Sequence, residues 1–220
     1  MRCCIHNGLV KFSDPATAVT DYILAAESFA LAVLLVQNTA PQSSVRLWAA
    51  AFIAVGISAL SGGWFHHRRL ELSEQARHAL WMITALGLLA ALALFLAAGV
   101  FASAAGYVRK GLLAGIAAAF VAGIAWMKRS GGERFGVTKS ATLLLFVLFV
   151  LAALLVRQFL RHGGGIDIIA GSMICVAAVT VQQAAPKLHP RFNHNDLCHV
   201  LFMIGLFFLY RGGLLLIDKV

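Results

Sequence analysis

The chain has 220 residues, of which 60% are hydrophobic and 12% charged, and its formal net charge is +9. Soluble domains are far less apolar, and the sequence repeatedly supplies the runs of about 20 apolar residues that cross a bilayer as a helix. The polar segments between these runs are short connectors, which leaves no room for a soluble domain. We therefore predict an all-α, polytopic membrane protein in which residues 1–220 form a single transmembrane domain.

Most Lys and Arg residues lie in the connectors between the apolar runs. At a membrane surface such residues contact anionic headgroups, so we expect membrane lipids, and not nucleic acid, as partners. The residues before Asp14 lack an apolar core of the length that a secretory signal has. We therefore expect the first span to be retained.

Seven membrane-spanning helices are predicted. Asp14 followed by Pro15 is typical of a helix start, and Ser73 is a suitable N-cap for the third helix. The connectors on the N-terminal side hold 11 of the 18 Lys and Arg residues and those on the other side hold 7, which predicts that the N-terminus lies inside. The Ala, Leu and Arg bias favours a bacterial cytoplasmic membrane. The predicted spans cover about 15–37, 45–67, 74–100, 108–127, 138–160, 166–183 and 195–215.

Polar residues gather at one predicted membrane face. The first, third and seventh spans begin at this face and the second span ends there, so residues far apart in the sequence come to one depth. We weigh two interpretations of them: a metal-binding or catalytic cluster, and a histidine-rich rim in contact with water. The residues are Asp21, His66, His67, His78, His194, Asp196 and His199.

The start of the seventh span carries a local pattern. Asp196 and His199 are three residues apart and Asn195 and His199 four, so each pair can share one helix face. A carboxylate with a histidine three residues on is a metal-binding arrangement in helical bundles. If Asn193 or Asn195 caps the helix, His194 lies outside it and could fold back. A second interpretation of Asp196 is a carboxylate that stabilises the helix N-terminus.

These side chains could bind zinc. A catalytic zinc ion takes three protein ligands and keeps one position open. The three could be His66 or His67, then His199, and then His194 or Asp196.

Glu27 stands apart from this layer. Counted from Pro15, it lies about 18 Å into the first span, close to the middle of the bilayer. A carboxylate at that depth is costly, usually faces the interior of the bundle, and usually serves a function. The alternative is a purely structural hydrogen bond between helices through Glu27 and Ser28.

GGWFHH, residues 62–67, ends the second span, and NDLCH, residues 195–199, opens the seventh. These two segments resemble motifs of the CREST superfamily, which includes the alkaline ceramidases, the adiponectin-receptor-like proteins and the hemolysin-III-like bacterial proteins. GGWFHH resembles the family motif of a serine, three residues and a histidine that ends the second span. The resemblance makes His66 the ligand, while Gly62 stands at the serine position and Ser61 precedes it by one residue.

The seventh span carries the other half of the resemblance. NDLCH, residues 195–199, is similar to the HxxxH motif of the family. His199 matches its second histidine, Asn195 stands at the first, and His194 lies one residue earlier. The aspartate of the family's third span has no counterpart in this chain, where Glu74 or His78 lies near its place. The resemblance implies a divergent bacterial member with a zinc site near one membrane face and hydrolysis of lipid amide or ester bonds.

Three functions are compared. The first is a zinc-dependent intramembrane hydrolase, in which His66, His199 and His194 or Asp196 hold the metal and a carboxylate, Asp21 or Asp196, moves the proton. The second is a non-enzymatic binding or transport protein centred on Glu27, with a pH-sensitive histidine-rich inner rim. The third is a structural subunit whose polar residues only hold helices together.

Overall fold

The computed structural model describes residues 14–129, 165–186, 189 and 192–219. This part of the chain is all-α apart from one isolated bridge between His189 and Phe192, which confirms the predicted fold class. All six helices are long and apolar enough to cross a membrane, as a multi-pass membrane protein requires. They are α1 Pro15–Gln37, α2 Ser43–Arg68, α3 Glu74–Ser103, α4 Gly106–Arg129, α6 Gly165–Ala184 and α7 His194–Gly213.

Six of the seven predicted spans correspond to these helices, with ends that coincide or differ by at most three residues. The largest difference is at α3, which continues to Ser103 because no residue between 100 and 103 breaks a helix. The predicted fifth span, 138–160, lies outside the described residues.

Helix starts follow from local capping chemistry. Pro15 occupies the first turn of α1, where its missing N–H costs nothing. The Ser73 side chain accepts a hydrogen bond from the Ala76 amide at the start of α3, as predicted. At the start of α7, Asn193 and Asp196 form a reciprocal capping box. His194 is consequently the first residue of α7, so the expectation that it lies outside the helix and folds back is wrong.

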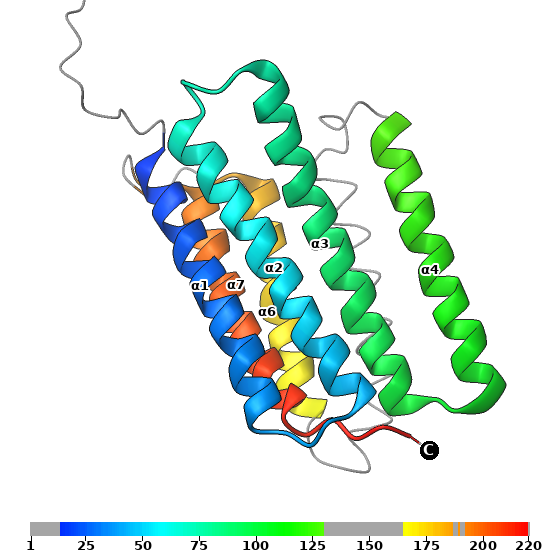
Figure 1. Ribbon diagram of the computed structural model, residues 1–220. Helices are drawn as coiled ribbons and strands as arrows, with labels where there is room; N and C mark the ends of the chain where they lie inside the picture. Colours follow the sequence, from blue (N-terminus) through cyan, green and yellow to red (C-terminus); the bar gives the residue numbers. More distant parts are fainter. Residues whose placement is uncertain (1–13, 130–164, 187–188, 190–191, 220) are drawn as a thin grey trace, which may run out of the picture.

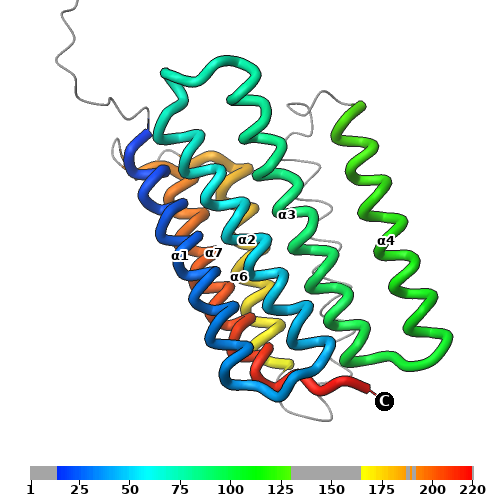
Figure 2. The backbone as a smooth tube through the Cα atoms, viewed as in Figure 1, coloured from blue at the N-terminus to red at the C-terminus, as the bar shows by residue number. Residues whose placement is uncertain are grey.

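The helices run side by side, and most chain neighbours are antiparallel (Figure 1). Helix α1 packs against α2 and α7, α2 packs against α3, α6 packs against α7, and α4 lies at the edge beside α3. Figure 2 shows two opposite ends of this bundle. We call the end where α1 and α7 begin and α2 ends the cluster end, and the opposite end the tail end.

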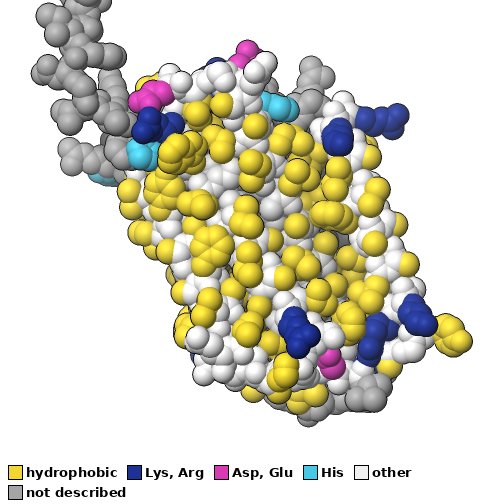
Figure 3. Space-filling view, viewed as in Figure 1, with side chains coloured by type: hydrophobic (Ala, Val, Ile, Leu, Met, Phe, Trp, Pro, Cys, Tyr) yellow, Lys and Arg dark blue, Asp and Glu magenta, His cyan; other side chains and the backbone are white. Residues whose placement is uncertain are grey.

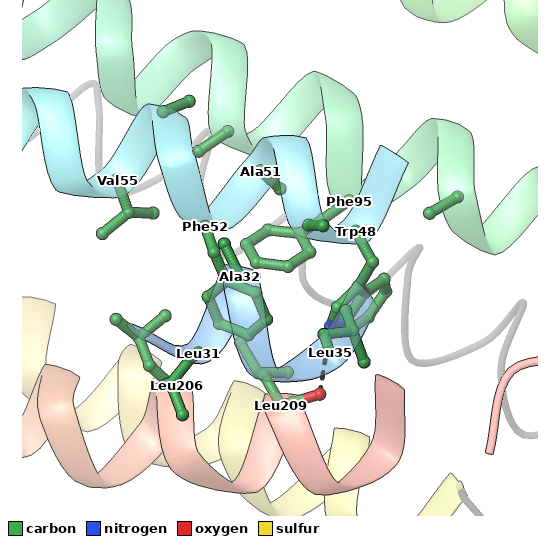
Figure 4. Packing of buried hydrophobic residues seen from close by; sticks show 14 of the residues in the cluster. Leu31, Ala32, Leu35, Trp48, Ala51, Phe52, Val55, Phe95, Leu206 and Leu209 are labelled. Atoms are coloured by element: carbon green, nitrogen blue, oxygen red, sulfur yellow. Dashed lines mark hydrogen bonds between the residues drawn. The ribbon is translucent and has the colours of Figure 1, made fainter. Parts of the chain in front are cut away.

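Aromatic and aliphatic side chains fill the bundle nearer the tail end (Figure 4). Trp48 is fully buried, and its ring meets Phe95 edge to face with 4.6 Å between the ring centroids. Its indole Nε1 donates a hydrogen bond of 3.0 Å to the carbonyl oxygen of Leu209, which links α2 to α7. The buried indole N–H is thereby satisfied, as a Trp in an apolar core requires.

The outer surface is apolar along the middle of the helices. Figure 3 shows hydrophobic side chains over the middle of one face, with Lys, Arg, Asp and Glu gathered towards the two ends. Val33, Val121 and Met173 are each more than half exposed. Exposed apolar side chains in a central band, with charges at both edges, are what a lipid-facing surface requires.

The segment after α7 crosses the tail end and contacts α2. The carboxylate of Asp218 accepts hydrogen bonds of 2.9 Å from the backbone amides of Ser43 and Ser44, at the start of α2. Gln42 donates to the Leu216 carbonyl and accepts from the Asp218 amide. Burial acts to raise the pKa of Asp218, but the hydrogen bonds from Ser44 and Ser43 outweigh it and lower the pKa below its usual value.

Candidate functional site

Polar side chains of α1 and α7 meet at the cluster end, where α2 also ends. The two helices are antiparallel neighbours, so their first turns and the last turn of α2 share one depth in the membrane. We call the following residues the polar cluster: Thr17, Thr20, Asp21, Asn193, Asp196 and His199.

Asp196 holds the first turn of α7 against α1. One carboxylate oxygen, Oδ2, accepts a 2.7 Å hydrogen bond from the Asn193 amide, and the other, Oδ1, accepts one of 2.7 Å from the Thr17 hydroxyl. The residue is fully buried. Both oxygens are therefore occupied, which confirms the interpretation of Asp196 as a carboxylate at the helix N-terminus. This geometry gives it a positioning role.

Asn193 connects the caps of the two helices. Its side-chain oxygen accepts from the amides of Asn195 and Asp196, at 2.7 and 3.3 Å. The amide nitrogen of the same side chain donates to the Asp14 carboxylate and the Thr17 hydroxyl, both at 3.2 Å. Asp14 makes no side-chain cap of its own helix and instead accepts this bond from α7.

His199 lies between two adjacent residues of α1. Its Nδ1 is 2.9 Å from the Thr20 hydroxyl and its Nε2 is 3.4 Å from Oδ1 of Asp21. The side chains of His199 and Asp21 are only 13% and 7% exposed. A carboxylate and an imidazole therefore face each other away from bulk water, each supplied by a different helix.

The Thr20 hydroxyl lies between a backbone acceptor and His199. It is 3.0 Å from the Thr17 carbonyl oxygen and 2.9 Å from Nδ1 of His199, and it has one proton to donate. When the hydroxyl donates to Nδ1, Nε2 carries hydrogen and can donate to Asp21. When it donates to the carbonyl, Nδ1 carries hydrogen, and in a neutral ring Nε2 presents its lone pair to Asp21. A lone pair facing a carboxylate is repulsive, so in this tautomer one further proton, on Nε2 or on the carboxylate, stabilises the pair.

Two glycines of α2 allow this part of α1 to approach closely. A Cβ on Gly62 would lie 3.1 Å from Oδ2 of Asp21, and a Cβ on Gly63 would lie 2.8 Å from the Tyr22 ring. A serine at residue 62, where the resembling family has one, would therefore contact the Asp21 carboxylate. Gly62 itself has no side chain to cover that oxygen.

The other predicted site residues are divided between the cluster end and its surroundings. His66 interacts electrostatically with His199, Asp14 and Asp196, so it borders the polar cluster. His67 lies instead beside Tyr22, whose hydroxyl is 3.1 Å from its Nδ1.

Three further candidates lie outside the polar cluster. The Ser61 hydroxyl donates to the Leu80 carbonyl and so connects α2 to α3. His78 is exposed on α3. Asn195 is half-buried, and its backbone amide is bonded to Asn193.

The described side chains supply an incomplete zinc site. Asp21 and His199 face each other, but a catalytic zinc ion needs three protein ligands. Among the residues that the structure describes, no three His, Cys, Asp or Glu side chains are grouped closely enough to hold a metal ion. Zinc binding by His66, His194 and His199 stays a prediction, and this arrangement does not fit it.

Glu27 lies deeper on α1. It is half-buried, and its Oε2 is buried without a hydrogen-bond partner among the described residues. The Ser28 hydroxyl donates to the Leu24 carbonyl of its own helix at 2.7 Å. The Ser28 proton is thus used within α1, and the structural alternative, a hydrogen bond between helices through Glu27 and Ser28, stays a prediction.

Sequence reasoning missed the two threonines. Thr17 and Thr20 supply the hydroxyls that bind Asp196 and His199. Their spacing was a usable signal, because Thr17 precedes Asp21 by four residues and Thr20 follows Thr17 by three, which places all three on one side of α1.

Comparison with known proteins gives one match. The model of a family of unknown function, DUF6962, matches residues 16–218. No curated protein and no solved structure matches the chain.

Proposed function

The chain belongs to DUF6962, a family of unknown function, and we propose that it is a membrane protein that binds and releases a proton at the Asp21–His199 pair. The observation that carries the proposal is that the Asp21 carboxylate and Nε2 of His199, both little exposed, face each other at 3.4 Å. We assign the tautomer in which the Thr20 hydroxyl donates to the Thr17 carbonyl and accepts from Nδ1, so that the lone pair of Nε2 faces the carboxylate and a further proton stabilises the pair. In this proposal, uptake and release of the proton accompany the binding or transport of a ligand in the bilayer.

The position of the pair supports coupling of the proton to helix movement. Asp21 belongs to α1 and His199 to α7, so a proton between them links the two helices. When the proton leaves, the interaction changes from attraction to repulsion. An ionisable pair inside a membrane segment is costly to maintain and generally marks an ion pathway or a proton relay. Protonation of a histidine is the usual form of such a switch.

Nuclear magnetic resonance of the ring nitrogens tests the proposal. In protein labelled with ¹⁵N-histidine, we expect Nδ1 of His199 to stay protonated across the titration while Nε2 gains and loses its proton. The substitution Asp21→Asn should shift the midpoint of the His199 titration, because it removes the charge that faces Nε2. His78→Gln, on the exposed face of α3, is the control that should leave the midpoint unchanged. An unprotonated Nδ1, or a midpoint that Asp21→Asn does not move, would contradict the proposal.

A zinc-dependent hydrolase of lipid amides or esters is the second candidate. The separation of 3.4 Å between Asp21 and His199 is close to the roughly 3.3–3.5 Å that separates two ligands of one tetrahedral zinc ion. His66, which borders the polar cluster, would have to move closer to the pair to serve as the third ligand. If this candidate holds, we expect purified wild-type protein to contain bound zinc and to release a labelled acyl chain from ceramide. Loss of both in His66→Ala, with unchanged thermal stability of the protein, would support it.

The finer topology is also a proposal: seven spans, the N-terminus inside, and a bacterial cytoplasmic membrane. It is supported by the directions of α4 and α6, which both run from the tail end to the cluster end (Figures 1 and 2). We propose that residues 138–160, an apolar run long enough to cross the bilayer, form the fifth span and connect these two helices. Alkaline phosphatase fused after Ser103 should be active, and the same fusion after Leu72 inactive.

A further inference from the structure

Helix α1 carries two polar tiers, one at each of two depths. Thr20 and Asp21 form the first, and Glu27 and Ser28 form the second, seven residues further on. Seven residues are about two helical turns, so the second tier lies on the same side of α1 and about 10 Å deeper in the membrane. Leu24 and Ala25, both buried, separate the tiers.

The described helices that pack against α1 bring no acidic, basic or histidine side chain to its middle. Helix α2 has no Asp, Glu, His, Lys or Arg between Trp48 and Gly63, and α7 has none between Val200 and Leu209. These are the helices that pack against α1. Within the described residues, the carboxylate that follows Glu27 towards the cluster end on α1 is Asp21. Each tier of α1 therefore carries one carboxylate.

The carboxylate of Glu27 is held in an unsatisfied state. Its Oε2 is buried and has no hydrogen-bond partner among the described residues, while Ser28 next to it uses its hydroxyl on the Leu24 carbonyl. A buried charged oxygen without a partner is strongly unfavourable. Uptake of a proton removes this charge.

We propose that Glu27 is a second proton-binding group, which receives its proton from the Asp21–His199 pair and extends the site to the middle of the bilayer. The inference rests on the proposed function of that pair. The transfer is balanced: the pair loses one proton and returns to a neutral imidazole and a carboxylate, and the Glu27 carboxylate becomes a carboxylic acid. Over about 10 Å the proton needs intervening water, which enters when α1 and α7 separate at the cluster end.

Proton flux through reconstituted protein tests the inference. The purified protein is placed in phosphatidylcholine–phosphatidylglycerol vesicles that contain a pH-sensitive dye, and a potassium–valinomycin gradient drives protons inward. We expect dye acidification with the wild type and at least a tenfold loss of the rate in Glu27→Gln. Glu27→Asp, which keeps the carboxylate, should retain part of the flux. Wild-type flux that persists in Glu27→Gln, or a wild type without flux, overturns the inference.

The His199 titration separates this inference from the function on which it rests. In Glu27→Gln the midpoint of His199 should stay within the wild-type range, which also shows that the variant is folded. In Asp21→Asn both the midpoint and the flux should change. A His199 that never titrates contradicts the proposed function, whereas a normal His199 titration with full flux in Glu27→Gln contradicts only the role of Glu27.

Discussion

Gly171 on α6 and Gly205 on α7 lie so close together that a Cβ on Gly171 would be 2.7 Å from the carbonyl oxygen of Gly205. The obstacle is backbone, which cannot rotate away as a side chain can. Small residues at helix contacts let backbones approach closely in membranes, where apolar side chains gain little by leaving lipid. The α6–α7 pair therefore depends on glycine at this contact.

We predict that Gly171→Ala lowers the free energy of unfolding by about 1–3 kcal/mol, because the added methyl group forces the two helices apart. Gly111→Ala in α4 is the matched control, since no atom of the described residues lies within 4 Å of a Cβ built there. The control should be neutral or stabilising by up to about 1 kcal/mol, because alanine is the better helix former. Thermal unfolding in detergent measures both. If the two variants are equally stable, the α6–α7 pair does not depend on glycine at residue 171.

The capping box of α7 predicts a specific loss of stability. Asn193→Ala removes the cap and the bonds to Asp14 and Thr17, so we expect destabilisation by about 1–2 kcal/mol. Asn195→Ala is the neighbouring control, because the hydrogen bonds described for Asn195 use only its backbone amide. Denaturant unfolding followed by circular dichroism compares the two. If Asn195→Ala lowers the free energy of unfolding as much as Asn193→Ala does, the Asn193 side chain does not have the capping role described.

Asp218 predicts how stability depends on pH at the tail end. Because the folded protein lowers its pKa, the ionised carboxylate stabilises the fold, and this contribution is fully present above the usual pKa of an aspartate. The contribution is lost as the pH falls through the lowered pKa. Asp218→Asn should therefore reduce stability by about 1 kcal/mol at neutral pH and by little in strong acid.

The control for Asp218 is Asp167→Asn, at the same end of the bundle. Asp167 contacts Arg211 at 3.6 Å, and the arginine side chain is about half exposed, so this ion pair contributes little. Melting temperatures measured from neutral to acidic pH compare the two variants with the wild type. If the gap between Asp218→Asn and the wild type does not close in acid, the capping role assigned to the carboxylate is wrong.

Metal removal gives a prediction for the cluster end. Because the described side chains do not assemble three ligands, dialysis against a zinc chelator should leave the melting temperature unchanged. The measurement is paired with metal analysis of the undialysed protein. If the protein contains about one zinc ion per chain and its melting temperature falls after chelation, the zinc-dependent hydrolase would be favoured over the proton-binding function.

The membrane-spanning helices were predictable because their signal is local. Length, apolar composition and capping residues such as Ser73 are visible within one segment, and six helices follow the prediction closely. The polar cluster was predictable only in part. Counting spans brought Asp21 and His199 to one depth, and helical spacing put Asp196 and His199 on related faces.

Side-chain partners were not predictable, because they depend on how α1 and α7 are rotated about their axes. That rotation decides that Asp196 binds Thr17 while His199 binds Thr20 and faces Asp21. It also directs Ser61 towards α3, although its sequence position next to Gly62 suggested the site. Spacing along one helix fixes which residues share a face, but not which neighbour that face meets.

The cap on α2 is contributed from far along the chain. Asp218 is separated from Ser44 by 174 residues, and Asp196 from Thr17 by 179. When the first two helices enter the membrane, Asp21 does not yet have His199 beside it and the amides of Ser43 and Ser44 do not yet have the Asp218 carboxylate. Until α7 and the segment after it are synthesised, these groups need other partners, such as water or lipid headgroups. Both ends of the bundle are thus completed by α7 and the segment that follows it.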